Sequence, residues 1–300
     1  MLRNLPRTLM AMAWLGLWFI HSQQVFAEGA VSVIDDTGAT VSLAQAAQRI
    51  ISLSPHATEL LFEVGAGKQI VGAVGYSDYP AAAKTLPRIG SANRLDAEKI
   101  ILLKPDLIVA WHSGNTLQDM KTLSRFNIPV FYSEPRKLDD IATNMDRLGR
   151  LTGHTKQASA KAKGFKKRLR EIDGENKNKS RVSVFFQLWR QPLMTVNGEH
   201  IISDVMTRCN ARNVFEELPG LTPTVSREAV IERKPEVIVA TDVALDELKK
   251  DWGSYNQIPA VRSGNYFVLS ADLLHRQGPR LIRGVEQFCQ AINSARVPDR

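Results

Sequence analysis

The sequence has few of the features that mark an enzyme, a nucleic-acid-binding protein or a membrane protein. Its 300 residues include two cysteines and 7% aromatic residues. GxSxG, HExxH, Walker and strand-linked GxGxxG motifs are missing, so no common nucleophile, zinc-protease or nucleotide site is indicated. The 39 basic and 31 acidic residues are spread widely. A nucleic-acid-binding surface would need a basic stripe interleaved with aromatic residues, and the sequence has none.

The first 27 residues have the pattern of a secretory signal peptide. Arg3 and Arg7 precede the apolar stretch Thr8–Ile20, and Val25-Phe-Ala27 places small residues at the positions expected before a cleavage site. The apolar stretch is shorter than the roughly 20 residues that span a bilayer, which argues against the alternative of an uncleaved anchor. No cysteine follows directly, so no lipid anchor is expected. We therefore predict cleavage after Ala27 and export of the mature chain.

The two cysteines, Cys209 and Cys289, are interpreted in the light of that location. An exported protein meets conditions that permit disulfides, and a bridge over 80 residues would stabilise the fold by roughly 4 kcal/mol. Two separate buried thiols are the alternative. Structural zinc is not expected, because the sequence has no CxxC and no histidine–cysteine cluster at ligand spacing.

Apolar runs alternate with helix-period segments along the chain. Continuous apolar runs are typical of strands buried on both faces of a parallel sheet, so the fold class predicted is α/β. A hairpin is expected within residues 31–43. The elements predicted next are strands at 49–54, 70–75, 106–111 and 129–133 and helices from Ser54 and at 96–103, 115–126 and 137–151.

A lysine- and alanine-rich segment separates two regions of this kind. Ala158, Ala162, Phe165, Leu169 and Ile172 recur at spacings of four, three, four and three residues, which predicts one long amphipathic helix with a polar exit at 174–180. A membrane- or partner-binding basic helix is the alternative to a solvated face. The predicted organisation is a signal peptide at 1–27, an N-terminal lobe at 28–152, an interlobe helix at 153–178 and a C-terminal lobe at 179–300.

An internal repeat indicates that the two lobes are alike. Segments 96–111 (DAEKIILLKPDLIVAW) and 226–241 (SREAVIERKPEVIVAT) align without gaps and share seven of 16 residues. Each is predicted to be a helix that stops at Lys-Pro before a buried strand. Two similar lobes joined by a rigid helix would leave a cleft, and such clefts are favoured ligand sites.

Three features follow predicted strands on the side where open α/β sheets bind ligands. Tyr76 lies in a polar, proline-closed loop, Trp111 ends a strand, and His275 lies in the polar stretch SADLLHRQGPR. Core filling is the alternative for the aromatic rings, and a solvated turn is the alternative for His275. The other histidines of the expected mature chain are scattered singly and are interpreted as surface or satisfied core residues.

Several segments resemble the periplasmic vitamin B12-binding proteins of ABC importers. They are ISLSPHATEL (51–60), YSDYP (76–80), LKPDLIVAW (103–111), VSRE (225–228) and PRLIRGVEQFC (279–289), together with the context of the first cysteine at 205–215. The resemblance covers essentially the whole expected mature chain. The wider group, which includes haem- and siderophore-binding proteins, shares two lobes and a rigid helix.

The resemblance implies roles for individual residues. A corrinoid would contact residues of two loops and two tryptophans: Tyr76, Trp111, Trp189, Asp272, Leu273, Leu274, His275 and Arg276. Cys209 and Cys289 match the disulfide of the family. Glu98 and Glu228 match carboxylates that dock on a dimeric permease, which works with ATPase subunits. The resemblance also implies a periplasmic location. The free protein is expected to be a monomer that carries cobalamin as cargo and has neither a resident cofactor nor a metal.

Some positions depart from the pattern of the family. Ala92, Met194 and Thr222 stand where relatives have large aromatic residues, whereas Trp189 stands where they have a small one. Haem or a ferric siderophore is the alternative cargo, with Tyr76, Tyr79 or His275 as axial ligands for haem. A periplasmic chelatase-like enzyme is a remote alternative, which would need a histidine–carboxylate pair facing the cleft.

Overall fold

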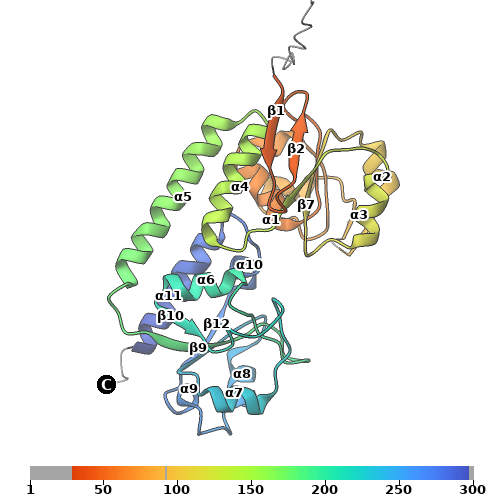
Figure 1. Cartoon of the computed structure of the whole chain (residues 1–300). Coiled ribbons are helices and arrows are strands. Elements are labelled where there is room, and N and C mark those ends of the chain that lie inside the picture. Colours follow the sequence, from red (N-terminus) through yellow and green to blue (C-terminus); the bar gives the residue numbers. More distant parts are fainter. Residues whose placement is uncertain (1–28, 92, 297–300) are drawn as a thin grey trace, which may run out of the picture.

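The computed structural model describes residues 29–91 and 93–296, which form two α/β lobes connected by a long helix (Figure 1). The predicted signal peptide and Ala92 lie outside the described residues. The N-terminal lobe contains β1 Val31–Ile34, β2 Thr40–Leu43, β3 Ile50–Ser52, α1 Pro55–Glu63, η1 Ala66–Gln69, β4 Ile70–Ala73, η2 Ala81–Thr85, β5 Gly90–Ser91, β6 Arg94–Leu95, α2 Ala97–Leu102, β7 Leu107–Trp111, α3 Leu117–Ser124, β8 Val130–Ser133 and α4 Leu138–Leu151. After α5 Thr155–Asn176, the C-terminal lobe contains β9 Val182–Gln187, α6 Ile201–Arg208, β10 Ala211–Asn213, α7 Arg227–Arg233, β11 Val237–Thr241, α8 Leu245–Trp252, α9 Pro259–Arg262, β12 Tyr266–Leu269, α10 Ala271–Leu274 and α11 Leu281–Arg296.

Each lobe is built on a four-stranded parallel sheet. The strand order is β4-β3-β7-β8 in the N-terminal lobe and β10-β9-β11-β12 in the C-terminal lobe. The predicted hairpin is the antiparallel pair β1–β2. The predicted α/β class with parallel sheets is therefore confirmed.

The central strands are buried on both faces, as their continuous apolar sequences indicate. In β7, Leu107 and Val109 pack into one hydrophobic cluster, while Ile108 and Ala110 pack into a second cluster on the opposite face. Strand β11 divides its side chains between two clusters in the same alternating way. Successive side chains of a strand point to opposite faces, so helices must cover both sides of each sheet.

The internal repeat corresponds to equivalent helix–strand units, α2–β7 and α7–β11. Asp96 and Ser226 are the N-caps, and their side chains accept hydrogen bonds from the backbone N–H groups of Lys99 and Ala229. Lys104 and Lys234, which precede the prolines, both adopt φ of 48°. The shared Lys-Pro pair thus ends each helix with the same left-handed residue before the strand begins.

Helix α5 runs along one side of both lobes (Figure 1). The five apolar residues of its predicted stripe are all buried. The helix continues to Asn176, so the expectation that its polar exit starts at Gly174 was wrong by three residues. Gly149 of α4 permits close contact, because a Cβ there would lie 2.1 Å from the Cβ of Ala158.

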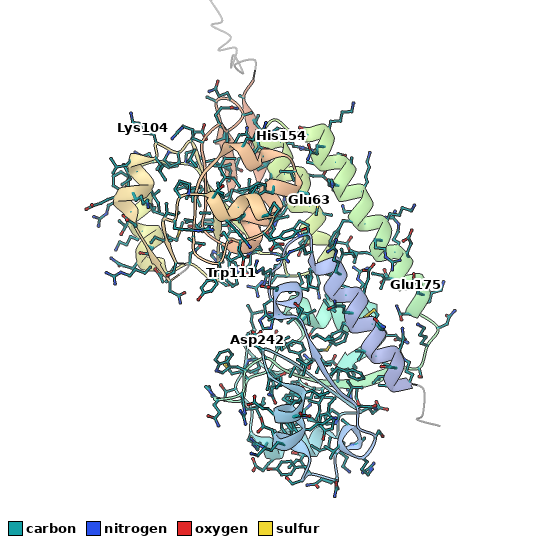
Figure 2. All side chains as sticks on the ribbon, turned by 180° about the vertical axis from the view of Figure 1, so that it is seen from behind. Glu63, Lys104, Trp111, His154, Glu175 and Asp242 are labelled. Carbon is teal, nitrogen blue, oxygen red and sulfur yellow. A yellow bond between two sulfur atoms is a disulfide. The ribbon has the colours of Figure 1, made fainter. Side chains whose placement is uncertain are left out.

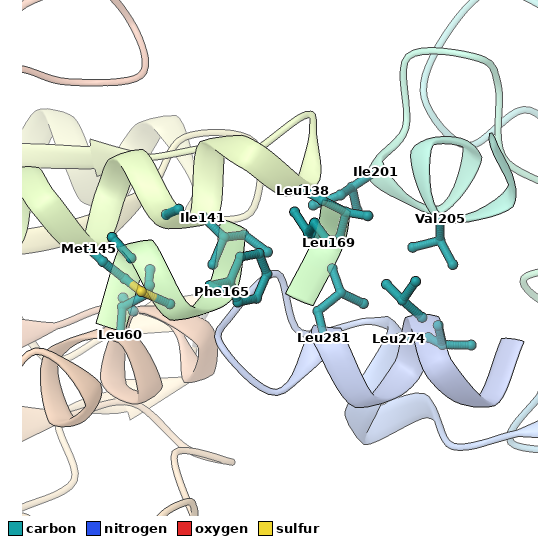
Figure 3. Packing of buried hydrophobic residues seen from close by; sticks show 14 of the residues in the cluster. Leu60, Leu138, Ile141, Met145, Phe165, Leu169, Ile201, Val205, Leu274 and Leu281 are labelled. Carbon is teal, nitrogen blue, oxygen red and sulfur yellow. The ribbon is translucent and has the colours of Figure 1, made fainter. Parts of the chain in front are cut away.

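One hydrophobic cluster continues from the N-terminal lobe through α5 into the C-terminal lobe. Leu60 of α1 and Met145 of α4 belong to the same cluster as Phe165 of α5, Val205 of α6 and Leu281 of α11 (Figure 3). Dense apolar packing across the junction resists shear, because any sliding would open cavities. The lobes are therefore joined by a packed core as well as by the chain.

The disulfide links two helices of the C-terminal lobe. Cys209 follows the last turn of α6, and Cys289 lies within α11. Both side chains are buried, and the predicted pairing is confirmed. Within the part of the chain described, no helix combines the length and apolar character needed to cross a membrane.

Candidate functional site

A cavity of about 370 Å³ lies where the two lobes meet. It is lined by residues of both lobes: Trp111, Ser113, Glu134, Arg136, Leu188, His200, Ile201, Leu221, Thr222, Leu274, His275 and Gln277. The carboxyl ends of the equivalent strands β7 and β11 point toward this region, and Figure 2 shows Trp111 and Asp242 on facing ends of the lobes. This is the edge of a parallel sheet at which ligands bind.

The indole of Trp111 is fixed by its surroundings at the end of β7. The backbone N–H of Trp111 donates to Oδ1 of Asn115 at 2.7 Å, so the loop after β7 folds back onto the end of the strand. A Cβ at Gly114 would lie 1.9 Å from Cε3 of Trp111, so only glycine fits against this ring. On another side, the ring of His56 meets the indole edge-on with centroids 5.5 Å apart. Burial lowers the pKa of His56 to about 4, which keeps this neighbour neutral.

The loop after β8 contributes a paired acid and base to the cavity. Glu134 accepts hydrogen bonds from the N–H and the hydroxyl of Ser113, both at 2.9 Å. Arg136 lies 3.2 Å from Oε1 of Glu134. The guanidinium and the carboxylate neutralise each other at the cavity wall.

Two histidines line the C-terminal side of the cavity. His200 is the N-cap of α6, and its Nδ1 accepts a hydrogen bond from the N–H of Ile202 at 3.2 Å. Burial, reinforced by repulsion from His275 and Arg136, lowers the pKa of His200 to about 4. Nε2 of His275 lies 2.9 Å from the hydroxyl of Thr241, and burial lowers its pKa against the opposing influence of Asp242. Both imidazoles are therefore neutral at pH 7.

Arg276 is committed to ion pairs. It lies 3.3 Å from Glu59, 2.6 Å from Asp78 and 2.7 Å from Asp272. The same segment contributes Arg280, which contacts Glu59 at 2.6 Å. These contacts join helix α1 and the 76–80 loop to the C-terminal lobe, so Arg276 holds the lobes together.

Tyr76 and Trp189 are exposed and do not line the cavity. Tyr76 is 82% exposed and adopts a left-handed φ of 61°. Tyr76 belongs to the 76–80 loop, and the contact between Asp78 and Arg276 attaches this loop to the C-terminal lobe. Trp189 is 57% exposed, donates from Nε1 to the carbonyl of Gln191 at 3.0 Å and lines a smaller adjoining hollow that shares Leu188 with the cavity.

The sequence-based expectations for ligand contacts are only partly reflected in the cavity wall. Trp111, Leu274 and His275 line it, but Asp272 and Leu273 do not. The stretch around His275 forms the short helix α10, which His275 caps, where a loop was expected. Thr222 lines the cavity, and Met194 pairs with Trp189 through backbone hydrogen bonds.

Glu134, Arg136, His200 and Gln277 were missed by the sequence analysis. Glu134 and Arg136 follow β8 directly. The rule that ligands bind at the carboxyl ends of parallel strands, which identified Tyr76 and Trp111, would therefore have found them as well. His200 and Gln277 carry no comparable local signal, because their place at the cavity depends on how α6 and the segment before α11 pack.

Glu98 and Glu228 occupy equivalent places in the two lobes. Each is exposed and lies in the first turn of its helix, two residues after the N-caps Asp96 and Ser226. Hydrogen bonds from its own backbone N–H and from Ser226 hold the pKa of Glu228 below its usual range. Helices α2 and α7, which carry these glutamates, belong to different lobes and lie far apart along the molecule (Figure 1).

The cavity offers hydrogen-bonding groups in place of metal ligands. Within residues 29–91 and 93–296, no three His, Cys, Asp or Glu side chains cluster closely enough to hold a metal ion. The carboxylate of Glu134 is bonded to Ser113 and Arg136, not to a histidine. The lining combines apolar side chains, among them Trp111 and Leu274, with polar ones, so it can hold a ligand that is partly apolar and partly polar.

Comparison with known proteins identifies relatives over most of the chain. The periplasmic binding protein family matches residues 50–273. The vitamin B12-binding protein of Yersinia pestis (strain Pestoides F) is 36% identical over 257 residues, which are 85% of this chain and 90% of that protein.

Solved structures share the architecture. The periplasmic vitamin B12-binding protein BtuF of Vibrio cholerae aligns with a TM-score of 0.77 and 33% identity, over 83% of this chain and 98% of that one. The haem-binding protein RhuT of Roseiflexus sp. RS-1 aligns with a TM-score of 0.74 and 22% identity, over 84% of this chain and 100% of that one. The second match establishes a common fold only.

Proposed function

The chain belongs to the periplasmic binding protein family, and we propose that it captures vitamin B12 or a related corrinoid between its lobes and delivers it to an ABC permease. The observation that carries the proposal is the cavity at the carboxyl ends of two parallel sheets, with the indole of Trp111 fixed at its wall. An immobilised aromatic ring gives a large ligand an apolar contact at little entropic cost.

The size of the cavity is compatible with a ligand that is only partly enclosed. Its volume of about 370 Å³ is at the small end of the range for ligand pockets. A corrinoid would therefore place part of its ring system inside and leave the rest toward the exposed rings of Tyr76 and Trp189. In this arrangement the two exposed rings cover the outer part of the ligand.

Capture requires no chemical step. The ion pairs of Glu59 and the shared hydrophobic cluster limit how far the lobes separate, so affinity depends on a preformed site. The permease would then recognise the two lobe surfaces, with Glu98 and Glu228 as matched points for its two equivalent subunits. Paired charges of this kind fix register more than they raise affinity.

Haem is the competing cargo, but two of its three candidate axial ligands, Tyr79 and His275, are engaged, and the third, Tyr76, is 82% exposed and does not line the cavity. The ring of Tyr79 lies under the guanidinium of Arg280, with 4.0 Å to the centroid, and Nε2 of His275 contacts Thr241. Arg136, the cation that could meet a haem propionate, is paired with Glu134. The arrangement therefore favours a corrinoid over a porphyrin.

Spectroscopic titration tests the proposal. Purified protein would be titrated with cyanocobalamin, dicyanocobinamide and haemin in parallel, with tryptophan fluorescence and visible absorbance recorded. We expect saturation by a corrinoid at one molecule per chain. Tight haemin binding without response to either corrinoid would contradict the proposal. The absorbance bands of protein purified from its native host would identify the natural cargo independently.

A further inference from the structure

The excess of basic over acidic residues in this protein is concentrated in and directly after helix α5. Residues 155–181 contain ten basic and three acidic residues, an excess of seven, whereas the whole chain of 300 residues has an excess of eight. Basic residues occur throughout the chain, but nearly all of the net positive charge therefore belongs to this helix and its exit. A surface charge of one sign attracts oppositely charged partners and speeds their encounter.

Four basic side chains of α5 form a stripe on the face that points away from the protein. Lys156, Lys163 and Arg170 recur at intervals of seven residues, Lys167 lies between the last two, and all four are exposed. Seven residues make almost two turns of helix, so these side chains share one face, opposite the buried apolar residues of α5. This basic stripe extends over about 21 Å, at a rise of about 1.5 Å per residue.

The carboxylates beside the basic stripe are engaged by two arginines. Arg168 contacts three of them at 2.7 to 3.2 Å, and Arg208 contacts two at 2.6 Å. The five are Glu171, Glu175 and Glu286 around Arg168, and Asp139 and Asp173 around Arg208. Within residues 29–91 and 93–296, one member of the stripe has a carboxylate within ion-pair distance, namely Lys167, which lies 3.9 Å from Glu171. The charge of the stripe is thus available to a partner outside the chain.

The composition of the basic stripe favours a flat anionic surface as this partner. The other residues of the same exposed face are small, Ala160 and Gly174. The face therefore has no aromatic or large aliphatic anchor of the kind found at the centre of a protein–protein interface. A bilayer with anionic headgroups requires only cations presented along a plane, and each lysine or arginine near its surface strengthens binding.

We infer that helix α5 attaches the protein to membranes containing anionic phospholipids, through the basic stripe. Figure 1 shows α2 on the side of the N-terminal lobe away from α5, so Glu98 remains free when the stripe lies on a membrane. Docking on a permease would require the molecule to turn away from the membrane surface. An attachment made only by exposed charges permits this, because it is weak and salt screens it.

Vesicle co-sedimentation tests the inference. The exported, processed protein would be mixed with vesicles of phosphatidylcholine alone and with vesicles that contain about 30% phosphatidylglycerol, at low ionic strength and at about 0.5 M salt. We expect binding to the anionic vesicles at low ionic strength only. Equal binding to both kinds of vesicle, binding that persists at high salt, or no binding at all would overturn the inference.

Two variants with the same loss of charge separate the basic stripe from the net charge. Replacement of its four members by glutamine, a good helix former, should weaken binding to the anionic vesicles at least about 50-fold. The matched control replaces four exposed lysines outside α5 by glutamine, namely Lys84, Lys121, Lys249 and Lys250. The control should keep most of the affinity, and both variants should retain the thermal stability of the unmodified protein. Equal loss of vesicle binding in the two variants would overturn the inference.

A soluble polyanion distinguishes a membrane from a charged polymer. Polyphosphate, added to the unmodified protein, should bind more weakly than the anionic vesicles. Tight binding of polyphosphate without binding to the vesicles would assign the basic stripe to a polymer and overturn the membrane attachment. Corrinoid binding is measured separately and should be unchanged in the stripe variant, so failure of the attachment and failure of the proposed function are distinguishable.

Discussion

Arg280 of the C-terminal lobe donates two hydrogen bonds to Glu59 of the N-terminal lobe, 2.6 Å from Nη2 to Oε1 and 3.0 Å from Nε to Oε2. The side chain of Glu59 is only 2% exposed, and Arg280 and Arg276 are its two charged partners. A buried carboxylate held by two arginines from the other lobe fixes the distance between the cavity walls.

Arg280→Ala should destabilise the protein. Removal of one partner leaves the charge of Glu59 only partly compensated, and the expected loss in the free energy of unfolding is about 3 kcal/mol. Chemical denaturation measures it. Arg283→Ala, at an exposed residue of α11, which begins directly after Arg280, is the control and should unfold like the unmodified protein. Equal stability of both variants would show that the interlobe pair contributes nothing.

Trp111→Ala should weaken corrinoid binding by an amount equivalent to about 1–3 kcal/mol, because the immobilised ring supplies apolar contact. Gly114→Ala should produce part of the same loss, since its Cβ would collide with the indole and displace it. Isothermal titration would measure both affinities. Phe126→Ala, an exposed aromatic outside the cavity, serves as the control. Full affinity in Trp111→Ala would remove the indole from the binding site.

Stability should fall between pH 6.5 and pH 4. The pKa values of His56 and His200 are about 4 in the folded protein and near 6.5 when unfolded, so the unfolded chain binds more protons in this interval. Each histidine should lower the free energy of unfolding by an amount on the order of 2–3 kcal/mol as the pH falls across this interval. Urea unfolding at pH 7 and pH 4.5 would show a smaller loss for His200→Ser than for the unmodified protein. The same acid sensitivity in both would show that His200 does not contribute to the loss of stability in acid.

Loss of the disulfide between Cys209 and Cys289 should lower the free energy of unfolding by about 2–4 kcal/mol, because the bridge closes a chain segment of 80 residues between α6 and α11. The double serine variant and the reduced protein should lose similar amounts. Thiol titration of the unfolded, unreduced protein should give no free thiol. A count of two would mean that the disulfide does not form in the cell.

Replacement of Glu98 and Glu228 by alanine should leave corrinoid affinity unchanged and reduce transporter-dependent uptake. Both carboxylates are exposed and distant from the cavity lining, so their effect is confined to the lobe surfaces. The difference in uptake between the variant and the unmodified protein should become smaller at high salt, because salt screens exposed charges. Exposed Glu216 and Glu232 provide control positions of the same charge. If the double variant takes up ligand normally at low salt, the two glutamates do not dock on the transporter and only stabilise the N-terminal ends of their helices.

The sequence by itself determined the α/β class, the parallel sheets and the long helix. Buried strands, N-caps such as Ser54 and the stripe of α5 are encoded by residues close together in the chain, where backbone sterics and burial act locally. The repeat at 96–111 and 226–241 likewise predicted two equivalent units, even to the matching Lys104 and Lys234. The disulfide and the family were indicated by resemblance.

Only the tertiary structure decided which polar groups line the cavity and which hold the lobes together. Arg276, which the resemblance predicted as a corrinoid contact, is engaged by Glu59, a residue 217 positions away in the chain. His200, one histidine among several in the sequence, lines the same cavity as Glu134 and Arg136 because of where the start of α6 packs. Pairing and convergence of this kind depend on how two separately encoded lobes pack against each other, and no local pattern records that packing.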